Sequence, residues 1–149
     1  MFTSYNLIKD SRVHLFRFGQ VDTTMRIADE FGPKKAYTMP ISQLSLIDSA
    51  ENPYGAVLAF VAESQTHGRG QRANTWTSPK GSNFYGTFVI RTENMPFYAP
   101  LISSLAIAET LEEYMASDKY SFKENEGGFG IKWVNDVLYD NLKVAGSLL

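Results

Sequence analysis

The amino-acid sequence predicts an α+β fold, in which a mixed β-sheet is flanked by helices. Short β-forming runs outnumber helical ones, and turns rich in glycine and proline separate them. The chain has 149 residues, of which 44% are hydrophobic and 13% are aromatic, so it can bury a real core. No internal repeat or interdomain linker is visible, and we expect one domain over residues 1–149.

Composition excludes several classes of protein. The chain has no cysteine, which excludes disulfides, thiolate catalysis and cysteine-based zinc sites. Its net charge of -2 argues against a main role in nucleic-acid binding, and no apolar run is long enough for a membrane span. No hydrophobic secretory segment begins the chain, so we expect a cytoplasmic protein, with an organelle matrix as the alternative.

The first elements lie before residue 53. Val13–Phe18 contains alternating β-formers and predicts a strand. Asp22–Thr24 supplies candidates for a helix N-cap, and Met25–Phe31 predicts a short helix that ends at Gly32–Pro33. Prolines punctuate residues 36–52, where we expect loop with short structure.

The middle of the chain predicts two strands and a long helix. Gly55–Ala62 is almost continuously apolar, as in a buried strand, and the polar segment Glu63–Trp76 after it predicts a loop. Asn83–Arg91 predicts a further strand. Pro100 begins a helix that extends to about Met115, because leucines and small residues recur there at steps of three and four.

The last third predicts a small antiparallel sheet. Residues 117–128 are polar and glycine-rich and predict a loop, and Gly130–Trp133 predicts a strand. Asp140–Asn141 predicts a tight turn between strands at Val137–Tyr139 and Leu142–Leu149. Because an apolar strand at the end of a chain exposes an unpaired edge, we expect it to pair with a second copy or a partner chain.

Segment Glu63–Trp76 is the first candidate for chemistry. No acidic residue occurs from Ser64 to Thr92, whereas Arg69 and Arg72 fall within that range. Glycines allow backbone N–H groups to approach an anion, and arginine adds charge-assisted hydrogen bonds. The alternative interpretation is an ordinary mobile surface loop, because short Gly/Arg patterns are common.

Three other segments have a functional and a structural interpretation. Lys132 lies at a strand end and is followed by Asn135 and Asp136, so this segment can bind an anion. The alternative is a simple strand and turn, with Trp133 packed in the core. The hydroxyls at Thr23–Thr24 can bind a polar group or cap the helix. Lys143 can meet an anion or be an exposed hairpin lysine.

Taken in order, these segments resemble the catalytic domain of biotin protein ligases, which are related to lipoate ligases and transferases. The resemblance spans nearly the whole chain beyond Phe18. The matching segments are Asp22-Thr-Thr-Met25, Gln65-Thr-His-Gly-Arg-Gly-Gln-Arg-Ala-Asn-Thr-Trp76, Ser78-Pro-Lys-Gly-Ser-Asn-Phe-Tyr85, Lys132-Trp-Val-Asn-Asp136 and Lys143-Val-Ala-Gly146. The motifs after the first correspond to Gln-x-x-Gly-Arg-Gly-Arg-x-Gly-x-x-Trp, Ser-Pro-x-Gly-x-Asn-Leu-Tyr, Lys-Trp-Pro-Asn-Asp and Lys-x-x-Gly in the family.

The resemblance implies a biotin/lipoate ligase catalytic domain similar to class II synthetases. It implies that biotin and ATP form biotinoyl-5′-AMP, with Mg²⁺ accompanying ATP, and that biotin then passes to a lysine in the biotin carboxyl carrier domain of a carboxylase. The family domain continues past Lys-x-x-Gly, so we expect residues 1–149 to hold its N-terminal portion and to be incomplete at the C-terminus.

The resemblance also assigns roles to residues. Arg69 and Lys132 would contact the biotin carboxylate and the α-phosphate, and Lys132 would be the residue most needed for adenylation. Thr23, Thr24 and Gln65 would bind the ureido ring of biotin. The ATP and adenylate site would comprise Gly68, Gly70, Arg72, Trp76, Asn135 and Asp136, and no residue is expected to form a protein metal cage.

Departures from the family pattern support a second hypothesis. Gln71 stands where the family has its second arginine, and Ala73 replaces a glycine, which restricts the backbone if φ is positive there. Met25 and Val134 replace an asparagine and a proline. On this second hypothesis, the chain is a non-catalytic descendant of the family that acts as a structural or interaction subunit. A lipoate-type acyl ligase or transferase is a third hypothesis, which the Gly-Arg-Gly and Lys-Trp-x-Asn-Asp segments disfavour.

Overall fold

The computed structural model describes residues 3–5, 13–31, 57–90, 97–117 and 127–149. These residues belong to two compact units, Met1–Glu93 and Asn94–Leu149. The expectations for residues 36–52, and for most of the loop at 117–128, lie outside the described ranges. A single domain over residues 1–149 stays a prediction.

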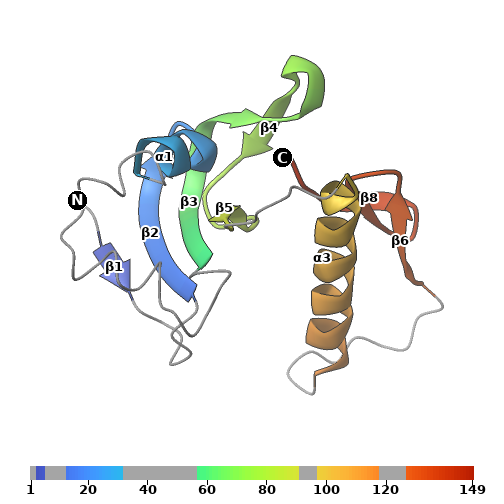
Figure 1. Cartoon of the computed structure of the whole chain (residues 1–149). Coiled ribbons are helices and arrows are strands. Elements are labelled where there is room, and N and C mark those ends of the chain that lie inside the picture. The colour runs from blue at the N-terminus through green and yellow to red at the C-terminus, as the bar shows by residue number, and fades with distance from the viewer. Residues whose placement is uncertain (1–2, 6–12, 32–56, 91–96, 118–126) are drawn as a thin grey trace. The chain divides into compact units, whose positions relative to one another are not determined.

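A mixed sheet forms the centre of the first unit (Figure 1). Its strand order is β1-β2-β3-β4, and β5 also pairs with β3. β2 and β3 are parallel, whereas β1 is antiparallel to β2, and β4 and β5 are antiparallel to β3. The strands are β1 (Thr3–Tyr5), β2 (Val13–Val21), β3 (Val57–Arg69), β4 (Thr75–Ser78) and β5 (Tyr85–Val89).

Helix α1 (Thr24–Phe31) follows β2 directly and covers one face of this sheet. Its buried residues Ile27 and Ala28 pack against Leu58 and Phe60 of β3. The rings of Phe16 and Phe60 stack with centroids 5.1 Å apart. Burial of a large apolar side chain stabilises a fold by about 1.5–3 kcal/mol, so this cluster fixes where β2 ends and α1 begins.

Strand β3 is longer than the sequence predicts. The expected strand ended at Ala62 with a loop after it, but β3 continues to Arg69. The loop prediction for Glu63–Trp76 is therefore wrong over its first half. Backbone pairing explains the difference: Val21 pairs with Gln65 on one side of β3, and Thr75 pairs with Arg69 on the other. Hydrogen-bonded neighbours hold this polar segment in the sheet despite its weak β-propensity.

The second unit combines one long helix with a three-stranded antiparallel sheet of order β6-β7-β8. Its elements are α3 (Ala99–Ala116), β6 (Phe129–Lys132), β7 (Asp136–Tyr139) and β8 (Leu142–Gly146). Asp140 and Asn141 have φ of 49° and 63°, as a tight hairpin turn requires, so this predicted turn is confirmed. Val137 of β7 and Ser104 of α3 are fully buried.

Strand β8 ends earlier than predicted, at Gly146 rather than Leu149. The next residue, Ser147, leaves the ladder to exchange hydrogen bonds with Asn135: its N–H donates to the Asn135 carbonyl at 3.0 Å, and its carbonyl accepts from Asn135 Nδ2 at 2.7 Å. These bonds draw the chain towards the β6–β7 turn. Within the described ranges, no helix is both long and apolar enough to cross a membrane.

Candidate functional site

Four polar side chains form a hydrogen-bonded group where β2, α1 and β3 meet. We call Thr24, Gln65, Ser78 and Thr87 the Gln65 cluster. Gln65 Oε1 accepts from the Thr24 backbone N–H at 2.9 Å and from Thr24 Oγ1 at 3.3 Å, and Gln65 Nε2 donates to Ser78 Oγ at 3.1 Å. Thr87 Oγ1 donates to Thr24 Oγ1 at 2.9 Å. The cluster thus presents both donors and acceptors in a largely buried place.

Both threonines at the start of α1 are buried, with Thr23 4% and Thr24 3% exposed. Asp22 Oδ1 accepts from the Thr23 N–H at 2.8 Å, and Thr23 Oγ1 accepts from the Met25 N–H at 3.3 Å. A side-chain hydrogen bond from Arg26, together with that from the Thr23 N–H, holds the pKa of Asp22 below its usual value. Thr23 therefore caps α1 and Asp22 holds the residue before the helix, while Thr24 reaches the Gln65 cluster.

Gly68 allows β3 and β4 to pack closely beside this cluster. A Cβ at Gly68 would lie 2.4 Å from the carbonyl oxygen of Trp76 and 2.7 Å from Ser78 Oγ. The pairing register shifts between Gln65 and Gly68, and the His67 N–H donates to the Asp22 carbonyl at 2.8 Å. No larger residue fits at position 68 without moving backbone, so the glycine holds the base of the hairpin against the start of α1.

The hairpin tip follows Gly70, whose N–H donates to the Asn74 carbonyl at 2.7 Å. A short 3₁₀ turn, Gln71–Ala73, forms the tip. Arg72 has φ 54° and ψ 41°, whereas Ala73 is not among the described residues with positive φ. The strain considered for Ala73 is thus absent, and the left-handed position belongs to Arg72.

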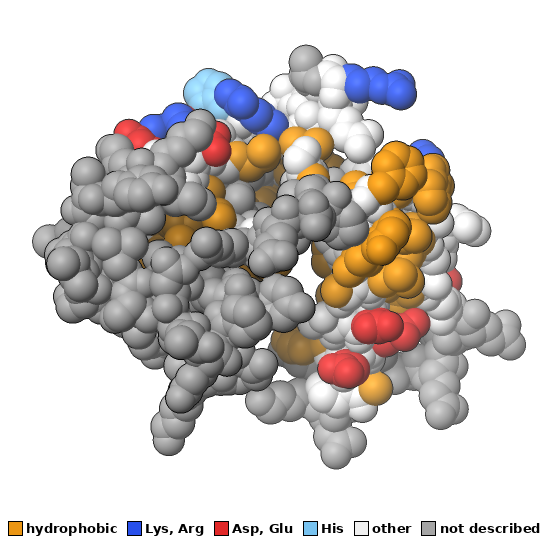
Figure 2. Space-filling model, viewed as in Figure 1, with side chains coloured by type: hydrophobic (Ala, Val, Ile, Leu, Met, Phe, Trp, Pro, Cys, Tyr) orange, Lys and Arg blue, Asp and Glu red, His pale blue; other side chains and the backbone are white. Residues whose placement is uncertain are grey.

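Basic side chains gather along one edge of the molecular face in Figure 2. Arg69 and Arg72 are exposed on the β3–β4 hairpin. Lys80 differs, because its Nζ lies 2.8 Å from Glu63 Oε2. The hydrogen bond and charge of this partner lower the pKa of Glu63 and raise the pKa of Lys80. The predicted cationic segment is thus partly neutralised at Lys80 by a carboxylate that precedes it in sequence.

The second unit carries the other candidates. Lys132 is the last residue of β6 and lies opposite Asp136 in the pairing register. Asp136 forms an ion pair with Lys143, whose Nζ lies 2.7 Å from Asp136 Oδ1. A Cβ at Gly146 would approach Lys143 Cε at 3.1 Å and Asp136 Oδ1 at 3.2 Å, so a larger residue there would crowd the pair.

The turn between β6 and β7 departs from two expectations. Trp133 is 72% exposed, so the alternative interpretation that packed it in the core is wrong. The side-chain amide of Asn135 donates a hydrogen bond to the Ser147 carbonyl, and this bond anchors the residues after β8. Ser104 Oγ of α3 also donates to the Val134 carbonyl at 3.5 Å, which ties the turn to the helix.

A model of the biotin/lipoate A/B protein ligase family matches residues 38–149. The chain belongs to this family.

Two of the proteins with similar sequences are named as ligases. Biotin–protein ligase 2 of Arabidopsis thaliana is 36% identical over 102 residues, which cover 66% of this chain and 29% of the relative. The bifunctional ligase/repressor BirA of Escherichia coli is 34% identical over 94 residues, covering 61% of this chain and 26% of the relative. The chain therefore spans less than a third of the length of either protein.

Solved structures show the same fold over more of the chain. Biotin protein ligase from Leishmania major in complex with biotinyl-5-AMP superposes with a TM-score of 0.61 at 26% identity, covering 92% of this chain and 51% of that one. The Aquifex aeolicus enzyme in complex with biotin and ATP also gives 0.61, at 28% identity, covering 90% and 45%. The predicted α+β fold with a mixed sheet and flanking helices is confirmed.

The residues predicted for the site from the sequence occur in both units. The first unit brings together Thr24 and Gln65 next to Gly68, and the second holds Lys132 with the Lys143–Asp136 pair. Sequence reasoning did not single out Thr87, for which nothing but its place in a strand was a signal, and it did not pair Lys143 with Asp136. Among the described residues, no group of three or more His, Asp or Glu side chains could hold a metal ion.

Proposed function

We propose that this chain is part of a biotin protein ligase that makes biotinoyl-5′-AMP and transfers biotin to a carrier lysine. A carboxylate oxygen of biotin attacks the α-phosphorus of ATP, and pyrophosphate leaves. The lysine amine then attacks the acyl carbon, loses a proton and releases AMP. The family includes both biotin and lipoate ligases, and the biotin protein ligases among the similar proteins support this proposal over a lipoate-type ligase.

The Gln65 cluster carries the proposal. The ureido ring of biotin has two N–H donors and a carbonyl acceptor, so its site must be neutral and offer both kinds of hydrogen-bonding group. Thr24, Gln65 and Ser78 offer such groups in a part-buried setting, with Thr23 adjacent. A buried polar group left without a partner costs about 1–3 kcal/mol, so the cluster discriminates against ligands that lack these atoms.

The β3–β4 hairpin is the proposed site of the adenylate. Gly68 and Gly70 allow the two strands of the hairpin to pack closely, and Arg69 and Arg72 on that hairpin offer guanidinium groups to the carboxylate and the phosphate. Trp76 is 37% exposed at the base of the hairpin, where its ring can border the adenylate pocket. Fixed cations here would offset the repulsion between two anionic reactants.

The lysines proposed for adenylation lie in the second unit. We keep Lys132 as the lysine most needed for adenylation, and the structure adds Lys143 as a second candidate. Asp136 restrains Lys143 through their ion pair, so its proposed role is to position this lysine. Asn135 would act indirectly, through its bond to Ser147. Mg²⁺ would arrive with ATP and take most of its oxygen ligands from phosphate and water.

The partner of the reaction would be the carrier domain of a carboxylase. The outer edge of β8 has no neighbouring strand among the described elements, so we propose it for pairing with a second copy or a partner chain. The cytoplasmic location and the absence of a nucleic-acid role stay predictions.

Pyrophosphate release in the presence of biotin and ATP tests the ligase proposal. We expect biotin-dependent release that Lys132→Ala lowers by about 100-fold or more, because electrostatic groups at developing charge contribute on that scale. Full activity in Lys132→Ala would remove that lysine from the mechanism. If the chain neither turns over nor binds biotin by calorimetry, the non-catalytic descendant becomes the better description.

A further inference from the structure

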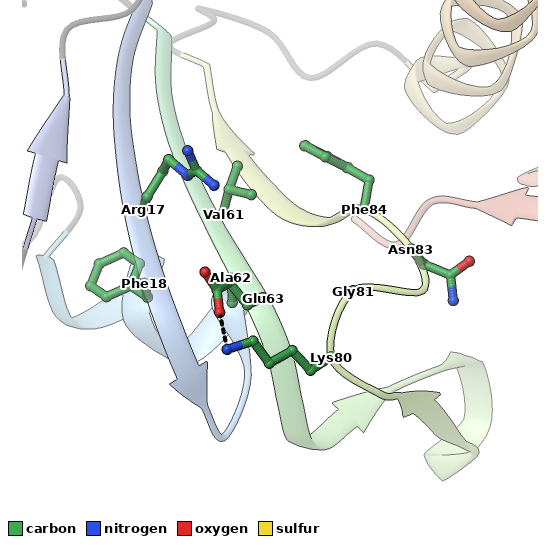
Figure 3. A pocket seen from close by; sticks show the side chains of 9 residues that line it. All are labelled: Arg17, Phe18, Val61, Ala62, Glu63, Lys80, Gly81, Asn83 and Phe84. Carbon is green, nitrogen blue, oxygen red and sulfur yellow. Dashed lines mark ion pairs between the residues drawn. The ribbon is translucent and has the colours of Figure 1, made fainter.

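The first unit carries a hollow beside strands β2 and β3 (Figure 3). Its volume is about 350 Å³, near the lower limit for small-molecule sites. Residues from β2, β3 and the segment before β5 line it, and none of them belongs to the Gln65 cluster or has a role in the proposed ligase reaction. The lining is Arg17, Phe18, Val61, Ala62, Glu63, Lys80, Gly81, Asn83 and Phe84.

The interior of the hollow is apolar. Val61 and Ala62 of β3 form its floor, and Ala62 is 4% exposed. Phe84 stands across from Arg17 and is 66% exposed. Its ring is held from two sides: it stacks on Phe88 with centroids 6.2 Å apart, and it lies over Gly86, where a Cβ would come within 2.7 Å of the ring. These two contacts hold the exposed Phe84 ring in place as one wall of the hollow.

The rim is cationic. Lys80 and Glu63 form an ion pair at 2.8 Å, which leaves the charge of Arg17 uncompensated, so the lining has a net charge of +1. The Arg17 guanidinium influences Glu63 through its charge but has no hydrogen bond to another described residue. A guanidinium whose N–H groups are open beside an apolar floor suits a carboxylate attached to a hydrocarbon or aromatic body.

We propose that this hollow is a binding site for a small organic monoanion, with its carboxylate on Arg17 and its apolar body between Val61 and Phe84. A dianion is disfavoured, because Glu63 occupies Lys80 and leaves one positive charge. The proposal does not depend on ligase activity, since it needs neither ATP nor the hairpin arginines. It adds a second ligand site to the first unit.

Nuclear magnetic resonance titration with 4-phenylbutyrate tests the site in the whole chain, without biotin or ATP. We expect backbone amide shifts confined to the residues around Arg17, Val61 and Gly81. The neutral amide, 4-phenylbutyramide, has the same shape and should bind about tenfold more weakly, because it lacks the charge that strengthens a hydrogen bond to a guanidinium. Shifts centred on Thr24 and Gln65 would overturn the proposal, as would equal affinity for the two compounds.

Substitutions give the second test. Arg17→Gln should weaken 4-phenylbutyrate about tenfold, whereas the matched control Arg26→Gln, on α1 outside the hollow, should leave its affinity within twofold. Glu63→Gln should tighten binding several-fold, because it releases Lys80 and raises the net charge of the rim. Unchanged affinity in both Arg17→Gln and Glu63→Gln would contradict the proposal, and the Glu63 gain cannot arise from misfolding.

Discussion

At the scale of single residues, backbone geometry constrains two positions of the β3–β4 hairpin, Gly68 and Arg72. Gly68 has backbone and Ser78 within 2.7 Å of where its Cβ would lie. Arg72 takes a left-handed backbone that suits glycine better. Lys80, by contrast, is an exposed surface residue, and its ion pair with Glu63 is what fixes its side chain.

Gly68→Ala should destabilise the first unit. Its new Cβ would meet the Trp76 carbonyl oxygen at 2.4 Å, and relief requires backbone movement, so we expect a loss of about 1–3 kcal/mol. Urea unfolding measures it. The control is Gly19→Ala, since nothing lies within 4 Å of a Cβ at Gly19 in β2. Equal midpoints for the two variants would show that the hairpin base is looser than described.

Arg72→Gly should separate stability from binding. Removing the side chain relieves the left-handed backbone at φ 54°, which should offset much of the added freedom of the unfolded chain and leave stability within about 1 kcal/mol. Loss of the guanidinium should weaken adenylate binding about tenfold. Thermal unfolding and calorimetry with biotinoyl-5′-AMP measure the two effects. Undiminished affinity would mean that Arg72 does not replace the arginine absent at Gln71.

The Lys80–Glu63 pair should give a pH-dependent contribution to stability. Because the pKa of Glu63 is lowered in the folded chain, its contribution is present above the unfolded value of 4.5 and is lost as pH falls through the folded pKa. Wild type should therefore be more stable than Lys80→Gln at pH 7, and this lead should shrink below pH 4.5. A stability difference between wild type and Lys80→Gln that is constant from pH 7 to pH 3 would show that it does not come from the ionised Glu63.

At the scale of elements, the sequence predicted positions better than lengths. Helices α1 and α3 and the Asp140–Asn141 hairpin follow from capping, periodicity and turn chemistry, and all three are present. β3 was underestimated, because its last residues are held by neighbours in β2 and β4, and strand pairing between distant segments leaves no local pattern. The Lys143–Asp136 pair was missed for the same reason: it spans two strands.

Asp136→Asn should test whether that pair positions a catalytic lysine. Asparagine keeps the size of the side chain but removes the charge that restrains Lys143, so we expect kcat for pyrophosphate release to fall about tenfold with little change in the KM for biotin. Asp140→Asn, in the exposed hairpin turn, is the control. A change in unfolding midpoint without a change in kcat would indicate a structural role alone.

At the scale of the whole molecule, the order of the motifs along the chain indicated the family more strongly than any single motif did. Gly-Arg-Gly at Gly68–Gly70 was ambiguous by itself, and its register with Thr23–Thr24 and Lys132 indicated the family, to which the chain belongs. The proposed chemistry draws on residues of both units, from Thr23–Trp76 and from Lys132–Gly146. The local geometry of the Gln65 cluster was beyond sequence reasoning, because Ser78 was known only as the start of a motif and Thr87 carries no signal apart from the fold.

Direct detection of biotinoyl-5′-AMP by mass spectrometry, after incubation with biotin, ATP and Mg²⁺, is the most direct test of this account. We predict that the wild-type chain forms the adenylate and that Gln65→Leu lowers its yield at least tenfold, because the ureido ring loses a buried partner. Thr66→Val, an exposed neighbour on β3, should retain the yield. Absence of the adenylate in the wild-type chain, or an equal yield in Gln65→Leu, would contradict the account.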